Sequence, residues 1–149
     1  MNWLTGGRFA QGSTKRLIAQ LADADATKRD FAAKELIKMG ADSVPPLIDA
    51  LQTQDLSLLL YYQQILARIS SATLPLTKAL ATAQPTVRAR VAEIFGISKD
   101  KLAIPALLEA LRDEDYTVRW RAVFALGNIG DAQTIPFLLP LLKDKDEEV

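Results

Sequence analysis

The sequence repeats itself about every 30 residues, and this repetition is the feature that most limits how the chain can fold. Five short segments each end in two leucines that are four residues apart. The pairs are Leu17 and Leu21, Leu47 and Leu51, Leu76 and Leu80, Leu107 and Leu111, and Leu138 and Leu142. A spacing of four places both leucines on one face of a helix. The pattern therefore predicts an all-α chain of repeated helical units.

Each leucine pair is followed by a second shared block, which defines the rest of the unit. It begins with a polar residue suited to a helix N-terminus, continues with an arginine and ends with a large apolar residue. These positions hold Asp25, Asp55, Gln84, Asp115 and Asp146; Arg29, Leu59, Arg88 and Arg119; and Leu36, Leu66, Phe95 and Leu126. Gly40 and Gly130 suit left-handed C-terminal caps. Each unit is thus predicted to be a short first helix and a longer second helix, buried by stacking on its neighbours.

The repeat register predicts one domain after a short N-terminal extension. The extension covers residues 1–13, where Trp3, Leu4 and Phe9 either pack on the domain or contact a partner. The repeat domain covers residues 14–149. Its repeats are expected at about 14–40, 45–70, 74–98 and 104–130, with a partial repeat at 135–149.

The last residues leave two alternatives open. Val149 aligns with Val87 and Val118, so the sequence stops where the next repeat arginine is expected. A terminal repeat needs a polar outer face, whereas this segment is strongly apolar. Either the sequence is part of a longer solenoid, or this end is covered by end-to-end self-association. The residues expected to make such a contact are Phe137, Leu138, Leu141 and Leu142.

The pattern DED-x-x-VR-x-x-A-x-x-ALG-x-IGD-x-x-x-IP-x-L-x-x-L at Asp113–Leu142 resembles HEAT repeats, in particular the short phycobilisome-lyase HEAT-like subset. The resemblance extends over residues 14–149 and is weakest in the second repeat, where Leu59 replaces the usual arginine. It implies a right-handed α-solenoid, an armadillo-like α-α superhelix of about four to five helical hairpins. Second helices in this family line a concave surface. The fold itself implies no single activity.

Composition excludes several kinds of chemistry. The chain has no cysteine and no histidine, which removes thiolate nucleophiles and the commonest general base and neutral metal ligand. Eighteen basic residues balance eighteen acidic ones, so charge does not favour nucleic acid or an anionic membrane. We expect neither a transmembrane helix nor a signal peptide, because no long apolar run and no small-residue cleavage site occur in the sequence. We expect a cytoplasmic protein with no catalytic residue, no metal and no cofactor.

The second helix of the fourth repeat carries two apolar stripes. On a helical wheel that advances about 100° per residue, one stripe is the core face, made of Val118, Ala122, Ala125, Leu126 and Ile129. The opposite stripe is Tyr116, Trp120 and Phe124, flanked by Arg121. Two interpretations remain open for this second stripe. Aromatic residues and arginine are common anchors at protein interfaces, but large side chains on a tightly curved inner face can also cover one another.

The same register places residues of the other second helices on the inner face. Repeat one contributes Ala26, Asp30 and Lys34, and repeat three contributes Pro85, Ala89 and Glu93 with Arg90 on the flank. Repeat two contributes Leu56, Leu60 and Gln64, with Tyr61 on the flank. The predicted partner-binding residues are Tyr116, Trp120, Arg121, Phe124, Leu56, Leu60, Tyr61, Gln64 and Arg90.

The repeated arginines are predicted to belong to the scaffold. Arg29, Arg88 and Arg119 occupy one register position, where an arginine can connect its helix to a neighbouring repeat. Aspartates at the preceding turns suit helix N-terminal caps. Because these acidic residues recur along the chain rather than converge, they do not indicate a metal site.

These features favour a non-catalytic scaffold that binds a peptide or protein partner on its concave face. The resemblance implies one alternative, a bilin lyase-like subunit or a chaperone that handles a tetrapyrrole or phycobiliprotein. HEAT-like DNA glycosylases need a basic concave face, which Asp30 and Glu93 oppose. HEAT-repeat di-iron hydroxylases need histidine ligands, which this sequence lacks.

Overall fold

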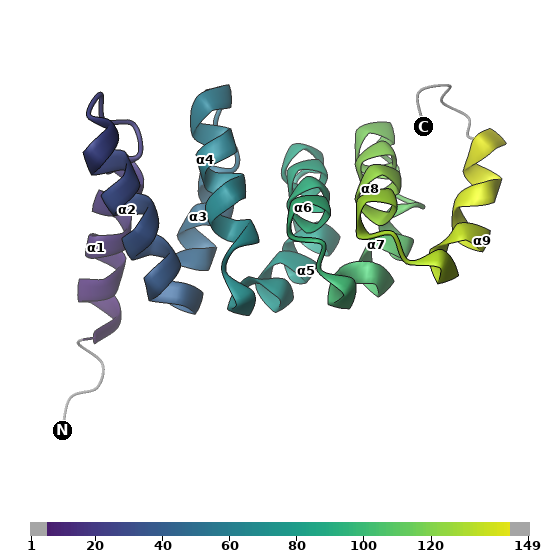
Figure 1. Ribbon diagram of the computed structural model, residues 1–149, viewed down its shortest axis with the longest axis horizontal. Helices are drawn as coiled ribbons and strands as arrows, with labels where there is room; N and C mark the ends of the chain where they lie inside the picture. The colour runs from purple at the N-terminus through teal and green to yellow at the C-terminus, as the bar shows by residue number, and fades with distance from the viewer. Residues whose placement is uncertain (1–5, 144–149) are drawn as a thin grey trace. The chain divides into compact units, whose positions relative to one another are not determined.

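The computed structural model describes residues 6–143, apart from the side chains of residues 6–11 and 142. Trp3, Leu4, the side chain of Phe9, Asp146 and Val149 therefore lie outside the described part of the chain. Within that part all regular structure is helical (Figure 1). The α-helices are α1 (Gly6–Gln20), α2 (Ala26–Met39), α3 (Val44–Ala50), α4 (Leu56–Ala67), α5 (Thr73–Thr82), α6 (Pro85–Ser98), α7 (Ile104–Ala110), α8 (Tyr116–Ile129) and α9 (Ile135–Leu138). The predicted all-α architecture is confirmed.

Short 3₁₀ turns connect the successive hairpins. They are η1 (Gly40–Ser43), η2 (Ser70–Ala72), η3 (Lys101–Ala103), η4 (Ala132–Thr134) and η5 (Leu139–Lys143). The chain divides into two compact units, residues 1–72 with α1 to α4 and residues 73–149 with α5 to α9. These are called unit 1 and unit 2 below.

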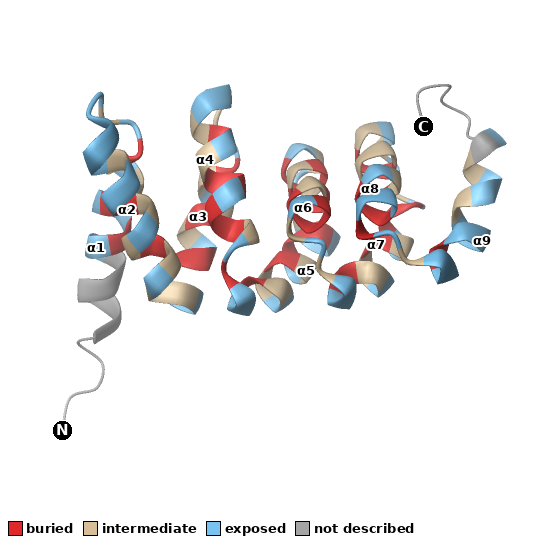
Figure 2. Ribbon diagram, in the orientation of Figure 1, coloured by how far each residue is buried: buried red, intermediate tan, exposed pale blue. Residues whose placement is uncertain are grey.

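Stacked helical hairpins form the core of each unit. In unit 1, α1 packs on α2 and α3 on α4, while α2 also contacts α4. In unit 2, α5 packs on α6 and α7 on α8, and the contact between α6 and α8 is the most extensive. Figure 2 shows the buried residues concentrated along the helices within each unit. The first four leucine pairs are buried, as their spacing predicts.

The fifth leucine pair differs from the others. Leu138 is half-buried, and the side chain of Leu142 lies outside the described part. The helix α9 that carries Leu138 has only four residues, and in the described part of the chain no second helix follows it to complete the hairpin. The prediction of a first helix at this position is confirmed, although its apolar side chains are not buried as in the other repeats.

Most of the predicted caps fix where the second helices begin and end. The exceptions are Gln84, whose side chain makes no capping hydrogen bond, and Gly40, whose φ of 58° and ψ of −126° differ from the left-handed helical cap predicted for it. The carboxylates of Asp25, Asp55 and Asp115 accept hydrogen bonds from the backbone N–H groups of the second helical residue, at 2.8, 2.8 and 2.9 Å. Such a side-chain bond satisfies one of the unpaired N–H groups of the first turn. At the other end of α8, Gly130 has a φ of 71° and its N–H donates to Leu126 O at 3.0 Å. The helix ends there because glycine adopts this left-handed conformation without strain.

The core stripe of α8 is confirmed, because all five of its residues are buried: Val118, Ala122, Ala125, Leu126 and Ile129. One assignment in the third repeat is wrong. Ala89 was expected on the inner face with Glu93, but it is buried. Its helix α6 packs on both α5 and α8, and a side chain as small as alanine is covered by larger neighbours even on the flank of a helix.

Candidate functional site

The repeated arginines bind the turn that precedes their own helix. Nη1 of Arg29 donates to the carbonyl oxygens of Asp23 and Ala24, both at 2.8 Å, and Nη1 of Arg88 donates to Ala83 O at 2.9 Å. Nη1 of the buried Arg119 donates to the carbonyl oxygens of Asp113 and Glu114, at 3.1 and 3.3 Å. These carbonyls would otherwise be unpaired at a turn. The structural role predicted for this register position is confirmed.

Two of these arginines also connect neighbouring repeats. Arg29 Nε donates to the hydroxyl of Tyr61 at 3.2 Å. Arg88 holds Asp113 with two hydrogen bonds, Nη2 to Oδ1 at 2.7 Å and Nε to Oδ2 at 2.8 Å. The hydrogen bond to Asp113 raises the pKa of Arg88. In α4 the buried Leu59 takes the arginine's place, so this register position supplies no such hydrogen bond.

The aromatic stripe of α8 is only partly open to solvent. Tyr116 and Phe124 are 46% and 51% exposed, whereas Trp120 is half-buried. The rings of Trp120 and Phe124 stack with their centroids 5.8 Å apart and an angle of 15° between their planes. The guanidinium carbon of Arg121 lies 4.6 Å from the centroid of the Trp120 ring, and Arg121 Nη1 is 3.0 Å from Glu93 Oε1. Tyr116 and Phe124 therefore offer the free apolar surface, while Trp120 and Arg121 also hold unit 2 together.

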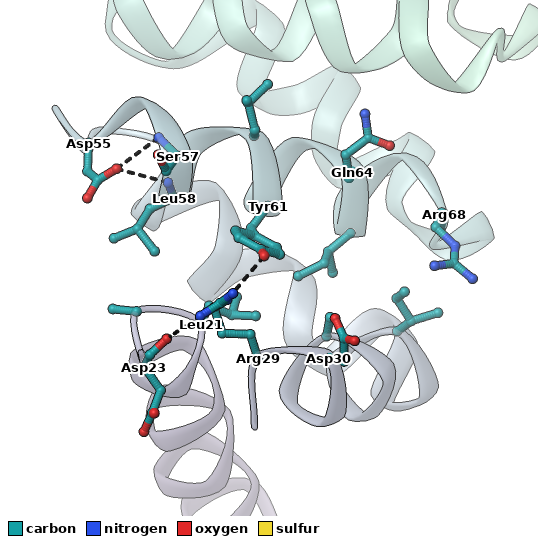
Figure 3. A pocket seen from close by; sticks show the side chains of 15 residues that line it. Leu21, Asp23, Arg29, Asp30, Asp55, Ser57, Leu58, Tyr61, Gln64 and Arg68 are labelled. Carbon is teal, nitrogen blue, oxygen red and sulfur yellow. Dashed lines mark hydrogen bonds between the residues drawn. The ribbon is translucent and has the colours of Figure 1, made fainter. Parts of the chain in front are cut away.

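The second helices of unit 1 enclose a cleft of about 770 Å³ between α2 and α4 (Figure 3). Three of the predicted binding residues line it: Leu60, Tyr61 and Gln64. Leu56 lies outside the lining and is 70% exposed at the start of α4. Arg90 is half-buried on α6 and belongs to unit 2. The structure thus places the predicted residues in two groups, one in each unit.

Large side chains at two register positions keep this cleft open. In unit 2, Gly96 of α6 lies against Ala125 of α8, so closely that a Cβ at Gly96 would be 3.1 Å from the Ala125 Cα. The corresponding residues of unit 1 are Ile37 on α2 and Ile65 on α4, and both line the cleft. Two isoleucines need more space than a glycine and an alanine. Consistently, α2 and α4 contact each other less extensively than α6 and α8 do.

The lining of the cleft mixes apolar and charged groups, and the sequence interpretation missed several of them. Asp30 was placed on the inner face but was not predicted to bind a partner, and Arg68 was not singled out. Arg68 lies just beyond the last turn of α4, two turns after Tyr61. A search of the register for polar residues at both ends of α4 would have found it.

Residues 6–143 contain no group of three or more acidic residues placed to hold a metal ion. No helix among them is both long enough and apolar enough to span a membrane. At the C-terminal end Phe137 is exposed, and Leu138 and Leu141 are half-buried. An end-to-end contact through these residues stays a prediction.

The stacked hairpins define the chain as a helical-repeat protein. Residues 73–149 match the family described as HEAT repeats. This match covers half of the chain, and the chain therefore belongs to the HEAT-repeat family, as its motifs indicate.

Two solved structures share the fold. One chain from the complex of CpcE and CpcF of phycocyanin lyase from Nostoc sp. PCC7120 is 22% identical, with a TM-score of 0.58 over 91% of this chain and 92% of that chain. The YibA protein of E. coli is 21% identical, with a TM-score of 0.53 over 97% of this chain and 59% of that chain. No curated protein matches the sequence. At these identities the likeness concerns the fold.

Proposed function

We propose that this protein is a non-catalytic interaction scaffold that binds a peptide or protein partner through the exposed faces of its second helices. The observation that carries the proposal is that α4 and α8 each expose a group of apolar side chains. Leu56 and Leu60 are 70% and 59% exposed, on a helix whose other face contributes Leu59, Ile65 and Leu66 to the core. Tyr116 and Phe124 are likewise exposed on α8, away from the buried core stripe of that helix.

The energetics of burial support this proposal. Covering one leucine or phenylalanine side chain completely is worth about 1.5–3 kcal/mol. Apolar side chains that gather on one face, rather than scatter singly, are typical of binding surfaces. A partner that covered Leu56 and Leu60 in unit 1, or Tyr116 and Phe124 in unit 2, would gain this free energy.

The proposal is tested by capture of a partner from a native extract, with the intact chain immobilised. We expect Tyr116→Ala and Phe124→Ala to reduce capture about tenfold and to change the melting temperature by only a few degrees. The matched control is Leu102→Ala, because Leu102 is 79% exposed in η3, away from the second helices. It should change neither quantity. Trp120→Ala is a poorer probe, since Trp120 also packs against Arg121 and Phe124.

The opposite pattern would contradict the proposal. If Phe124→Ala lowers the melting temperature strongly and leaves capture unchanged, the aromatic stripe belongs to the core of unit 2. Equal loss of capture in the Leu102→Ala control would show that the binding is nonspecific adsorption of apolar surfaces.

A second candidate function is that of a bilin lyase-like subunit, or of a chaperone for a tetrapyrrole or phycobiliprotein. It is favoured by the likeness to a chain of the CpcE and CpcF complex of phycocyanin lyase over 91% of this chain. Trp120 and Phe124 would supply the aromatic surface for a planar ligand. An absorbance titration of the intact chain with a free bilin tests this reading, and the absence of any spectral change would overturn it.

A further inference from the structure

The cleft between α2 and α4 contains four polar side chains that the fold does not use: three with charged or amide groups, and the hydroxyl of Ser57. Asp30, Gln64 and Arg68 all line it, and none of them makes a hydrogen bond or ion pair with another residue in the described part of the chain. Figure 3 shows them on the two helices that face each other, with Asp30 on one and Gln64 and Arg68 on the other. The other charged groups of the cleft are already engaged in the fold.

The charged side chains of Asp23, Asp55 and Arg29 already make hydrogen bonds within the fold. Asp55 Oδ1 accepts from the N–H groups of Ser57 and Leu58, at 2.8 and 3.1 Å. Asp23 Oδ1 accepts from Asp25 N at 2.9 Å, and this bond lowers the pKa of Asp23. The guanidinium of Arg29 is taken up by two turn carbonyls and the Tyr61 hydroxyl. A ligand would therefore find the side chains of Asp30, Gln64 and Arg68, together with the smaller hydroxyl of Ser57, available as polar partners.

Charge decides which kind of ligand suits the cleft. Its lining carries three carboxylates, those of Asp23, Asp30 and Asp55, against the two guanidinium groups of Arg29 and Arg68. The carboxylates lie toward the start of α2 and α4, whereas Arg68 follows the end of α4. A ligand with two carboxylates, such as a tetrapyrrole, would meet like charge over most of the cleft. A ligand with a cationic group near Asp30 would meet the opposite charge.

The apolar lining of the cleft favours a ligand that has an apolar part next to its cationic group. Ala33 and Ile37 on α2 and Leu58 and Ile65 on α4 form its walls, and Leu60 is an exposed apolar side chain of the same lining. A volume of about 770 Å³ has room for several side chains of a bound segment and lies within the range of ligand-binding pockets. The isoleucines Ile37 and Ile65, which hold the two helices apart, are part of these walls.

We propose that this cleft binds a segment of a partner polypeptide in which a large apolar side chain stands close to a lysine or arginine. The apolar side chain packs against Leu60 and the isoleucines, and the cationic group pairs with Asp30. Gln64 supplies both a hydrogen-bond donor and an acceptor for the main chain of the segment. This inference rests on the proposed function and deepens it by naming the chemistry of the segment that unit 1 recognises.

The test is a selection of random 12-residue peptides displayed on phage, with the intact chain as the target. We expect the selected peptides to contain a lysine or arginine within four residues of a leucine, isoleucine or phenylalanine. The tightest peptide is then synthesised with a fluorescent label and titrated by fluorescence polarisation. Asp30→Asn should weaken its binding about fivefold, and Leu60→Ser about tenfold.

The matched control for Asp30→Asn is Asp49→Asn. Asp49 is also an exposed aspartate within a helix, but it lies on α3 and does not line the cleft. Its substitution makes the same change in net charge and should leave peptide affinity unchanged. If both variants weaken binding equally, the effect is a general one of net charge and the proposed pairing with Asp30 is wrong.

Two further outcomes separate this inference from the proposed function. Selected peptides that lose affinity with Phe124→Ala but not with Asp30→Asn or Leu60→Ser would overturn the cleft proposal while supporting a binding role for α8. Enrichment of acidic peptides, or no enrichment of any peptide, would also overturn the cleft proposal. The proposed function would then still be judged by capture of a folded partner and its dependence on Tyr116 and Phe124.

Discussion

At the scale of single residues, the pair of Arg88 and Asp113 connects two repeats of unit 2. Both side chains are only 12% exposed, and two short hydrogen bonds join them. Two parallel bonds between a guanidinium and a carboxylate fix the geometry as well as the charge. Removing one partner leaves the other charge largely buried without compensation.

We therefore expect Arg88→Ala to lower the free energy of unfolding by about 2–3 kcal/mol. Glu35→Gln is the matched control, because Glu35 pairs with Lys38 at 3.8 Å on the surface, with side chains 37% and 78% exposed. Its effect should stay within about 0.5 kcal/mol. Urea denaturation of both variants measures the difference. Equal effects would show that the buried position of the first pair does not matter.

The carboxyl group of Asp23 provides a pH-dependent prediction. A hydrogen bond from the Asp25 N–H lowers its pKa below the usual 3.8, and the nearby Lys28 ammonium lowers it further. Because the pKa is lower in the folded state, the stabilisation is present above pH 3.8 and is lost as the pH falls through the folded-state value. An NMR titration of the Asp23 carboxyl should show a midpoint below 3.8. In Lys28→Gln the midpoint should rise only partly; a complete return to 3.8 would show that the backbone bond contributes nothing.

At the scale of helices, replacing each of the two glycines in the second helices of unit 2 by alanine should have opposite effects on stability. Gly96 lies against α8, with a Cβ position 3.1 Å from the Cα and 3.3 Å from the Cβ of Ala125. Gly127 has nothing within 4 Å of its Cβ position. In both helices alanine is intrinsically preferred over glycine by about 1 kcal/mol. At Gly96 this gain is opposed by a tight contact with a backbone atom of the fully buried Ala125, which would have to shift by a few tenths of an ångström.

We expect Gly127→Ala to stabilise the protein by about 0.5–1 kcal/mol and Gly96→Ala to destabilise it by about 1 kcal/mol. Thermal unfolding followed by circular dichroism checks both. Stabilisation by Gly96→Ala would mean that α6 and α8 can move apart at little cost. The close contact would then not explain the difference between the α6–α8 packing and the open cleft of unit 1.

The sequence predicts the helical units better than the spaces between them. The first four leucine pairs, the N-cap residues Asp25, Asp55 and Asp115 and the recurring arginines each follow from spacing along a single helix, and the structure confirms them. A helical wheel gives the direction of a side chain but not the distance to the next helix. For this reason it left open whether Trp120 packs against its neighbours, and it did not show that Ile37 and Ile65 hold open a cleft.

At the scale of the whole molecule, the exposed apolar groups belong to two separately packed units. Leu60 lies in unit 1 and Phe124 in unit 2, and each is more than half exposed. The HEAT-repeat fold stabilises each repeat mainly through its nearest neighbours. A change on the exposed face of α4 should therefore leave the packing of α8 intact, and the reverse should hold as well.

A double-mutant cycle in partner binding tests whether a single partner uses both groups. We expect Leu60→Ser and Phe124→Ser each to lower the affinity for the captured partner about tenfold. The double variant should lower this affinity about a hundredfold. Their effects on binding free energy should add because the two residues belong to separately packed units. Surface plasmon resonance with the purified partner measures all four affinities. If the double variant is no weaker than Phe124→Ser alone, the partner contacts unit 2 only, and the cleft of unit 1 serves a different ligand.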